Sequence, residues 1–393
     1  MFQFSGEILQ SKSWLNRALI IQHFNPQIIL VSESPSEDVF HLKKAVQSVS
    51  SKNEFSLGAG GTSFRFFAFL ISRYKGTWKL NADPRLLERP QAEIKTVLHQ
   101  LGVVSTFTAT GLLLESKGWE PKRQITCSAE VSSQFVSGLL LSSWNLEFDL
   151  EIIIAKPVVS YGYLGLTIDL LKSAGMKLLL EENQEYVKCT VLKNQLSPLS
   201  EMCCELDISS AFALAAAAVI NGNAEITNWN PDSKQPDLVF QEIFKMMNIS
   251  FLVSVKVFTI RRHEHWNALN FNLGSSPDLF PVLAVLCAFA SGVSELTGTG
   301  QLKFKESDRF GKTRELLDLI GVKTEMLADG IRIFGGSSKV SCDENIVFDP
   351  DQDHRMAMAA GLIVLKGYKL SVLQPEVVNK SYPSFWQDVG IQP

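Results

Sequence analysis

Residues 316–336, LLDLIGVKTEMLADGIRIFGG, hold the pattern that decides the fold. An amphipathic stretch runs into Gly321, and a glycine at this place can end a helix in the left-handed conformation. Alternating apolar residues then surround Asp329-Gly330, which is typical of two strands joined by a tight turn. Residues 98–118, LHQLGVVSTFTATGLLLESKG, repeat the same order. The two stretches therefore predict a repeated unit in which a helix is followed by a β-hairpin.

A second kind of segment also recurs, in which a polar residue precedes an apolar run rich in small residues. Such a run is typical of a helix that is buried on all sides. The six copies begin at Ser13, Thr62, Ser133, Ser209, Asp278 and His354. They recur roughly every 70 residues after one shorter first step. Together the two patterns predict an α/β protein of six β-α-β-α-β-β units, arranged as two similar domains of three units each.

The composition is that of an ordinary soluble globular protein, with 46% hydrophobic residues among 393 and a formal net charge of -4. This charge does not favour a nucleic-acid partner. The longest apolar run, residues 279–290, is too short to cross a membrane. The start, MFQFSGEILQ, lacks the basic region of a secretion signal. The six cysteines form no C-x-x-C pair, so reduced thiols in a cytoplasmic protein are the simplest interpretation.

Residues 303–309, KFKESDR, concentrate charge at the expected start of the helix that ends at Gly321. Helical spacing would put Lys305 and Arg309 on one face, with Glu306 beside them. One interpretation is a solvated helix start with salt bridges. The other is a small anionic substrate held by the two cations, with Glu306 available for proton transfer.

Polar and charged residues also collect at the starts of the expected buried helices. Each helix start leaves amides unpaired and carries partial positive charge, so several starts facing one cleft would attract phosphates and carboxylates. Ordinary helix capping is the alternative for each residue taken alone. Arginines within apolar helix starts favour the anion-binding interpretation, because a buried charge needs a partner. The residues are Lys12, Ser13, Arg17, Thr62, Arg65, Ser132, Ser133, Gln134, Asp278, His354 and Arg355.

Three other kinds of site find little support. The glycine-rich residues 58–61 lack the Lys-Ser/Thr that follows in a nucleotide P-loop, and they do not match the dinucleotide fingerprint. His263 and His265 have no third ligand nearby, so they are weak evidence for zinc. No G-x-S-x-G nucleophile elbow is present.

Nine motifs, taken in order, span Ser11 to Asp388. They are SKSWLNRALI, GAGGTSFRF, DPRLLERP, VSSQF, LDISSAFALAAAA, SPDLFPVLAVLCAFA, KESDR, DHRMAMA and KSYPSFWQD. In this order the chain resembles the 5-enolpyruvylshikimate-3-phosphate (EPSP) synthase family. The resemblance implies the inside-out, barrel-like enolpyruvyl transferase fold, with buried parallel helices in two domains of three β-α-β-α-β-β units.

The same resemblance implies where the domains divide and what each contributes. Residues 11–205 would form one domain, which holds the shikimate 3-phosphate site and part of the phosphoenolpyruvate site. Residues 1–10 and 206–393 would form the other, which holds the catalytic carboxylates and the arginines that bind the substrate carboxylate. Because ligands come from both halves, the resemblance also implies that the domains close around the substrates.

The implied reaction transfers the enolpyruvyl group of phosphoenolpyruvate to the 5-hydroxyl of shikimate 3-phosphate, in the shikimate pathway to chorismate and aromatic amino acids. Phosphate is released, and no metal or organic cofactor is implied. Asp278 matches the hydroxyl base and Glu306 the proton donor, while Lys12 would neutralise charge that develops between the two substrates. We expect a cytoplasmic monomer whose partners are these small molecules, with no nucleic acid and no membrane.

Matched positions imply two sets of substrate contacts. Those for shikimate 3-phosphate are Lys12, Ser13, Arg17, Ser132, Ser133, Gln134, Ser160, Tyr163, Asp278, Gln301 and Lys305. Those for phosphoenolpyruvate are Lys12, Gly61, Arg89, Gln134, Arg309, Arg355 and Lys380. Within the second set, Arg309 and Arg355 match the pair that grips the carboxylate, because planar guanidinium groups suit planar carboxylates.

Three positions depart from the family pattern. Ala59 and Gln301 stand where asparagine is common, and Phe66 stands where a smaller residue, often proline, follows the arginine. These changes bear on substrate affinity and on the response to glyphosate, which the family binds in the phosphoenolpyruvate site. They do not bear on the reaction itself.

Two alternatives stay open at this point. The sister enzyme that uses UDP-N-acetylglucosamine carries a loop cysteine with no evident counterpart here, and its Lys-Asn is replaced by Lys12-Ser13. A catalytically silent anion-binding homologue is the other alternative. The intact Lys12, Asp278, Glu306 and Lys380 argue against it.

Overall fold

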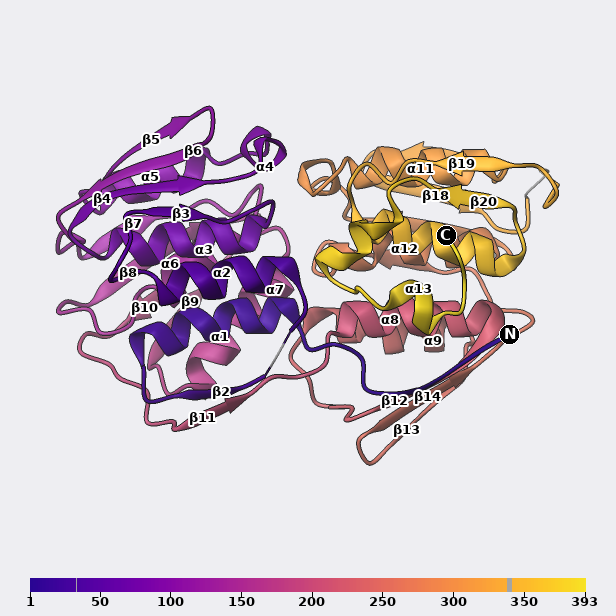
Figure 1. Cartoon of the computed structure of the whole chain (residues 1–393), viewed down its shortest axis with the longest axis horizontal. Helices are drawn as coiled ribbons and strands as arrows, with labels where there is room; N and C mark the ends of the chain where they lie inside the picture. The colour runs from indigo at the N-terminus through magenta and orange to yellow at the C-terminus, as the bar shows by residue number, and fades with distance from the viewer. Residues whose placement is uncertain (33, 338–340) are drawn as a thin grey trace. The chain divides into compact units, whose positions relative to one another are not determined.

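The computed structural model describes residues 1–32, 34–337 and 341–393. The chain divides into two compact units (Figure 1). The discontinuous unit consists of Met1–Gln10 and Glu205–Pro393, and the continuous unit consists of Ser11–Cys204. Glu205 therefore belongs to the discontinuous unit, whereas the resemblance placed it in the other domain.

The continuous unit contains two complete repeats. The first is β3 (Glu54–Ser56), α3 (Gly61–Ser72), β4 (Gly76–Asn81), α5 (Ala92–Gln100), β5 (Val104–Thr108) and β6 (Gly111–Ser116), with the short α4 (Pro84–Glu88) inserted. The second is β7 (Gln124–Thr126), α6 (Gln134–Leu141), β8 (Leu150–Ala155), α7 (Tyr161–Ser173), β9 (Leu178–Glu182) and β10 (Tyr186–Val191). The sheets have the orders β3-β4-β6-β5 and β7-β8-β10-β9.

The discontinuous unit also contains two complete repeats. One is β1 (Phe2–Gly6), α8 (Ile208–Asn221), β12 (Gly222–Thr227), α9 (Phe240–Met246), β13 (Phe251–Ser254) and β14 (Val257–Arg261). The other is β15 (Asn270–Asn272), α10 (Phe280–Ala288), β16 (Val293–Thr297), α11 (Arg309–Leu319), β17 (Thr324–Leu327) and β18 (Gly330–Phe334). In all four complete repeats the first two strands of the sheet are parallel and the last two form an antiparallel hairpin.

The remaining repeat of each unit is shorter than the sequence predicted. One holds α1 (Lys12–Phe24), β2 (Ile29–Val31), α2 (Glu37–Gln47) and β11 (Glu201–Cys203), and the other β19 (Ile346–Phe348), α12 (His354–Lys366), β20 (Leu370–Val372) and α13 (Phe385–Asp388). Each has a two-stranded parallel sheet in the part of the chain that the structure describes. The few residues between α2 and β3 leave no room for a hairpin. The α/β class is confirmed, with four of the six repeats at full length.

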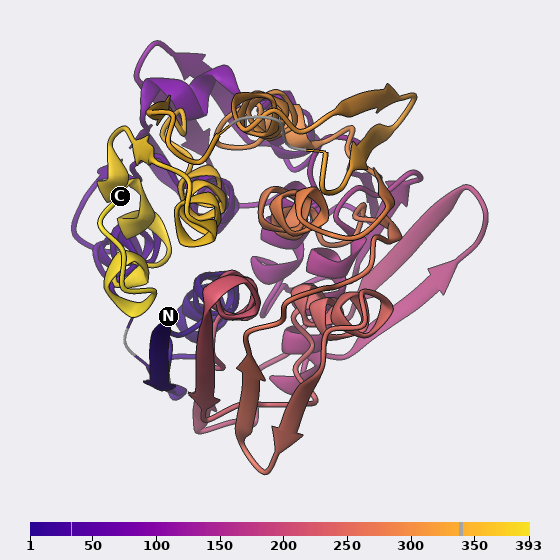
Figure 2. The same ribbon diagram turned by 90° about the vertical axis from the view of Figure 1, so that its right-hand side faces the viewer.

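The apolar helices lie inside each unit and the sheets lie outside them, as Figure 2 shows for the discontinuous unit with several helices end-on. Every residue of α10 is buried, and in α8 only Asn221 is not. The predicted starts of the six apolar helices are confirmed to within two residues. The hairpins predicted within residues 98–118 and around Asp329-Gly330 are also confirmed. Within the described residues, no helix is long and apolar enough to cross a membrane.

The six cysteines form no disulfide bond, and their thiols differ in how deeply they are buried. Burial raises the pKa of both Cys189 and Cys287 to about 12. Cys203 and Cys342 are exposed. A buried thiol with a raised pKa is neither accessible nor ionised, so it reacts slowly.

We therefore expect Ellman's reagent at pH 8 to modify Cys203 and Cys342 in the folded protein, while Cys189 and Cys287 react only after denaturation. Peptide mapping of the labelled protein gives the sites. Equal labelling of Cys287 and Cys342 under native conditions would show that α10 is not the closed core helix described above.

Candidate functional site

Arg309, the first residue of α11, is the centre of a charged cluster in the discontinuous unit. Its side chain is 1% exposed and contacts three carboxylates, each at 2.7 Å. Nη1 pairs with Asp278, Nη2 with Glu306, and Nε with Asp353. Burial lowers the pKa of Arg309, but attraction to these three carboxylates outweighs burial and raises the pKa well above its ordinary value. The guanidinium is therefore permanently charged.

Turns, rather than one helix, bring the members of this cluster together. The 3₁₀ helix η3 (Leu302–Phe304) ends before Lys305, and α11 begins only at Arg309. The prediction that helical spacing aligns Lys305, Glu306 and Arg309 is therefore wrong. Asp308 caps α11 by accepting a hydrogen bond from the amide of Gly311, and this cap shapes the turn.

Asp278 connects two arginines. It lies in the 3₁₀ helix η2 (Pro277–Leu279) before α10, and its second carboxylate oxygen pairs with Nη2 of Arg355 at 3.1 Å. Burial by itself would raise the pKa of Asp278, but Arg355, Arg309 and Lys305 together hold that pKa well below its ordinary value. The structure thus brings together four residues that the sequence singled out: Asp278, Glu306, Arg309 and Arg355.

Asp353 is a member of the cluster that the sequence analysis missed. Its side chain is fully buried, and it accepts hydrogen bonds from Nε of Arg309, from the Ser307 hydroxyl at 3.2 Å and from the Arg355 amide at 2.9 Å. The last of these bonds caps α12. An aspartate directly before a predicted helix start is the signal that would have revealed it.

Two further predicted residues of this unit have other surroundings. Gln301 is buried and donates a hydrogen bond to the carbonyl of Gly274 at 3.3 Å. Lys380 is the last residue of the 3₁₀ helix η4 (Pro375–Lys380) and is half-buried. Among the described residues, no group of three or more His, Cys, Asp or Glu side chains has the arrangement of a metal site.

Arg17 is the buried cation of the continuous unit, and it differs from Arg309 in its partners. All its contacts are neutral: Nε donates to the Thr167 hydroxyl at 2.7 Å, and Nη1 and Nη2 donate to the carbonyls of Ser13 and Tyr163 at 2.6 and 2.9 Å. No carboxylate pairs with Arg17 in the described part of the chain. Burial lowers the pKa of Arg17 to about 10. A buried, uncompensated positive charge favours an anionic ligand.

Six of the predicted residues meet near the start of α6. The Ser133 hydroxyl donates to the carbonyl of Ser160 at 3.2 Å. The amide of Gln134 donates to Thr62 at 3.0 Å, and its carbonyl accepts from Arg65 at 2.6 Å. Arg65 also donates to Ser132 at 3.5 Å and to Gln91 at 3.0 Å. Arg65 therefore positions Ser132 and Gln134 from the neighbouring helix α3.

Lys12 and Gly61 have neighbours that bear on an anion site. The ammonium of Lys12 pairs at 3.0 Å with Asp38 on α2, a carboxylate that the sequence analysis did not identify. Gly61 lies against Arg89, since a Cβ added to Gly61 would lie 3.0 Å from Nη1 of Arg89. The absence of a side chain at Gly61 therefore lets the guanidinium of Arg89 lie close to the backbone.

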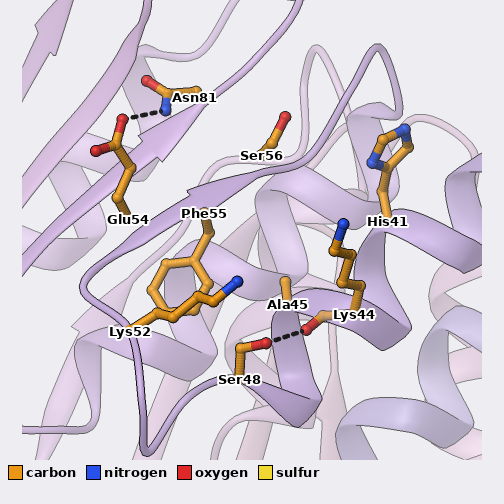
Figure 3. Close-up of a pocket in the computed structure, with 9 residues that line it drawn as sticks. All are labelled: His41, Lys44, Ala45, Ser48, Lys52, Glu54, Phe55, Ser56 and Asn81. Carbon is orange, nitrogen blue, oxygen red and sulfur yellow. Dashed lines mark hydrogen bonds between the residues drawn. The ribbon is translucent and has the colours of Figure 1, made fainter.

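A cavity of about 290 Å³ lies between α2 and β3 (Figure 3). None of the predicted site residues lines it. Its one carboxylate, that of Glu54, accepts hydrogen bonds from Asn81 at 2.7 Å and from Lys79 at 2.8 Å. The lining residues are His41, Lys44, Ala45, Ser48, Lys52, Glu54, Phe55, Ser56 and Asn81.

Comparison with known sequences gives one consistent family. A family model described as EPSP synthase (3-phosphoshikimate 1-carboxyvinyltransferase) matches residues 8–389. A 3-phosphoshikimate 1-carboxyvinyltransferase of Methanoculleus marisnigri is 31% identical over 341 residues, which cover 84% of this chain and 77% of the relative. A protein of the same name from Saccharolobus islandicus is 28% identical over 398 residues, which cover 97% of this chain and 94% of the relative.

Comparison with solved structures gives the fold. An EPSP synthase from Acinetobacter baumannii has a TM-score of 0.73 at 20% identity, over 99% of this chain and 95% of the other. The enolpyruvyl transferase NikO from Streptomyces tendae has the same TM-score of 0.73 at 15% identity, over 99% and 94%. The two-domain enolpyruvyl transferase fold is therefore confirmed.

Two capping aspartates of the discontinuous unit, Asp353 and Asp308, allow a matched test of the buried cluster. Replacing Asp353 with alanine leaves Arg309 buried with less compensation, so we expect Asp353→Ala to lower the free energy of unfolding by about 3–5 kcal/mol. Asp308→Ala removes an exposed cap of the same residue type and should cost about 1 kcal/mol. Urea denaturation of both variants measures the difference. Equal losses would mean that Asp353 acts only as a cap.

Proposed function

The chain belongs to the EPSP synthase family, and from this premise we propose how its side chains carry out the family reaction. The protein transfers the enolpyruvyl group of phosphoenolpyruvate to the 5-hydroxyl of shikimate 3-phosphate and releases phosphate, as a step of the shikimate pathway. The family match over residues 8–389 is the observation that carries this conclusion.

Two carboxylates divide the proton transfers. As the 5-hydroxyl oxygen bonds to C2 of phosphoenolpyruvate, Asp278 takes the hydroxyl proton and Glu306 gives a proton to the C3 methylene. The resulting tetrahedral intermediate then breaks down in the reverse sense: a proton from C3 returns to Glu306, which restores the double bond. The phosphate that leaves C2 takes up the proton held by Asp278. Both carboxylates contact Arg309, and this shared contact supports placing them at one reacting centre.

The binding roles follow the charges of each unit. In the discontinuous unit, Arg309 and Arg355 bind the carboxylate of phosphoenolpyruvate, and Lys380 contributes to its phosphate. Asp278, Gln301 and Lys305 contact shikimate 3-phosphate from this unit.

The continuous unit supplies the remaining contacts. Arg17 supports the assignment most strongly, because it is buried and its hydrogen-bond partners are a hydroxyl and two backbone carbonyls, all neutral. Lys12 serves both substrates and neutralises the charge that develops during addition. The contacts to shikimate 3-phosphate are Lys12, Ser13, Arg17, Ser132, Ser133, Gln134, Ser160 and Tyr163. Those to phosphoenolpyruvate are Lys12, Gly61, Arg89 and Gln134.

The acceptor follows from sequence rather than from the fold. NikO and the Acinetobacter enzyme match with equal TM-scores, so the fold does not discriminate among enolpyruvyl acceptors. The relatives with the higher identities are named 3-phosphoshikimate 1-carboxyvinyltransferase. Phosphate release from phosphoenolpyruvate, measured with shikimate 3-phosphate and with UDP-N-acetylglucosamine, tests this choice. Release with the second acceptor alone would overturn it.

The protein works as a cytoplasmic monomer in this proposal. Six free cysteines, two of them exposed, suit a reducing compartment. All the assigned residues belong to one chain, so the chemistry requires no second subunit.

The carboxylate roles are tested by Asp278→Ala and Glu306→Gln. We expect each variant to fold and to lose turnover by about a hundredfold or more, because proton transfer by a positioned group contributes on this order. Asp318→Asn, an exposed change on α11, is the control and should keep its activity. Coupled measurement of phosphate release gives the rates. Near-normal turnover in both variants would remove these carboxylates from the chemistry.

The role of Gly61 is tested with glyphosate, a competitor of phosphoenolpyruvate in this family. A Cβ at position 61 would press on the guanidinium of Arg89, so we expect Gly61→Ala to raise the glyphosate inhibition constant more than the KM for phosphoenolpyruvate. Competitive inhibition assays on the wild type and the variant measure both. A wild type that resists glyphosate while keeping a normal KM would show that Ala59 and Phe66, rather than Gly61, determine the pocket.

A further inference from the structure

The three carboxylates around Arg309 differ in their access to solvent. The side chain of Asp353 is 0% exposed, that of Glu306 is 16% exposed and that of Asp278 is 21% exposed. Asp353 also holds the Ser307 hydroxyl and the first turn of α12. It is therefore a fixed partner of Arg309, whereas the more exposed Asp278 can exchange.

Asp278 is also the carboxylate that bridges the two arginines. Its Oδ1 accepts from Nη1 of Arg309 at 2.7 Å, and its Oδ2 accepts from Nη2 of Arg355 at 3.1 Å. One oxygen on each guanidinium is how an arginine pair holds a planar carboxylate ligand. The Nε and Nη2 sides of Arg309 are already occupied by Asp353 and Glu306. A substrate carboxylate that bridges Nη1 of Arg309 and Nη2 of Arg355 must therefore compete with Asp278.

We propose that Asp278 is an internal stand-in for the substrate carboxylate, and that phosphoenolpyruvate displaces it from Arg309 and Arg355. This inference rests on the proposed function, in which the same arginine pair binds phosphoenolpyruvate. It adds an order of events, because Asp278 becomes available to the acceptor hydroxyl only after phosphoenolpyruvate has taken its place.

The exchange changes the basicity of Asp278. While it bridges the arginines, their charges hold its pKa well below the ordinary value, and a carboxylate of this kind is a weak base. Once a ligand carboxylate neutralises the two arginines, of the three cations that lower this pKa only Lys305 still acts on Asp278. Asp278 then accepts a proton more readily. The base is thus activated by the binding of the second reactant.

The cluster is built to survive the exchange. Arg309 keeps its contacts with the buried Asp353 and with Glu306 when Asp278 leaves, so the guanidinium stays in place. Arg355 stays on α12, whose first turn Asp353 caps. The arginine pair is therefore preorganised for the incoming carboxylate.

Calorimetric titration with phosphoenolpyruvate alone tests the competition. We expect Asp278→Asn to bind phosphoenolpyruvate about tenfold more tightly than the wild type, or more, since a charge-assisted hydrogen bond contributes on that order. Asp318→Asn, the same change of residue type on an exposed site, should bind like the wild type. Glu306→Gln removes the same charge at the same distance from Arg309 but leaves Asp278 on both arginines, so its gain should be smaller.

Binding by Asp278→Asn that is no tighter than that of the wild type, or no tighter than that of Glu306→Gln, would overturn the inference. A crystal structure of the wild type with phosphoenolpyruvate gives an independent answer that does not depend on any variant folding. We expect Asp278 to be out of hydrogen-bond distance of at least one of the two arginines. An Asp278 that still bridges both would overturn the inference.

Phosphate release by the wild-type preparation separates this inference from the proposed function. One result is that phosphate release requires shikimate 3-phosphate while Asp278 is not displaced. That result would overturn the inference but support the proposed function. No release with shikimate 3-phosphate would sink the function itself.

Discussion

A guanidinium that is removed from water must be compensated, and this requirement organises the discontinuous unit. Arg309 is almost fully buried and meets the requirement with three carboxylates from three separate segments of the chain. Those segments are the turn before α10, the turn before α11 and the cap of α12. Because the desolvation penalty of an unpaired buried charge is large, these three helix starts have to converge on one point.

The continuous unit answers the same constraint in the opposite way. Arg17 is also buried, yet its contacts are a hydroxyl and two backbone carbonyls. These acceptors satisfy its hydrogen bonds without cancelling its charge, which remains available to an anion. One repeated architecture thus carries two kinds of cation, one neutralised by aspartate and glutamate and one whose charge its hydrogen-bond partners leave uncancelled. This difference suits an enzyme whose substrates carry both phosphates and a carboxylate.

The likeness to two solved enolpyruvyl transferases at 20% and 15% identity shows the fold and not the acceptor. In the proposed function, the side chains at the starts of the buried helices select the acceptor. The shortened repeats that contain α1 and α12 show that the sheets of a repeat can change while its candidate site residues are kept. Both have lost the hairpin, yet α1 carries Lys12 and Arg17, and α12 carries Arg355.

Hydrophobic periodicity, glycine helix ends and polar caps are local signals in the sequence. They were enough to predict the α/β class, the β-α-β-α-β-β repeat and most helix starts. The sequence also identified Asp278, Glu306, Arg309 and Arg355 as candidate site residues. The tertiary structure alone decided how these four residues meet, since Glu306 and Arg309 are joined by a turn rather than by helical spacing. It also revealed Asp353, Asp38 and Thr167 as partners of the cations. The physical reason is that charge compensation acts through space. A buried arginine pairs with whichever carboxylate or hydroxyl the packing of distant segments brings within reach. The order of residues along the chain does not give the distances between those segments.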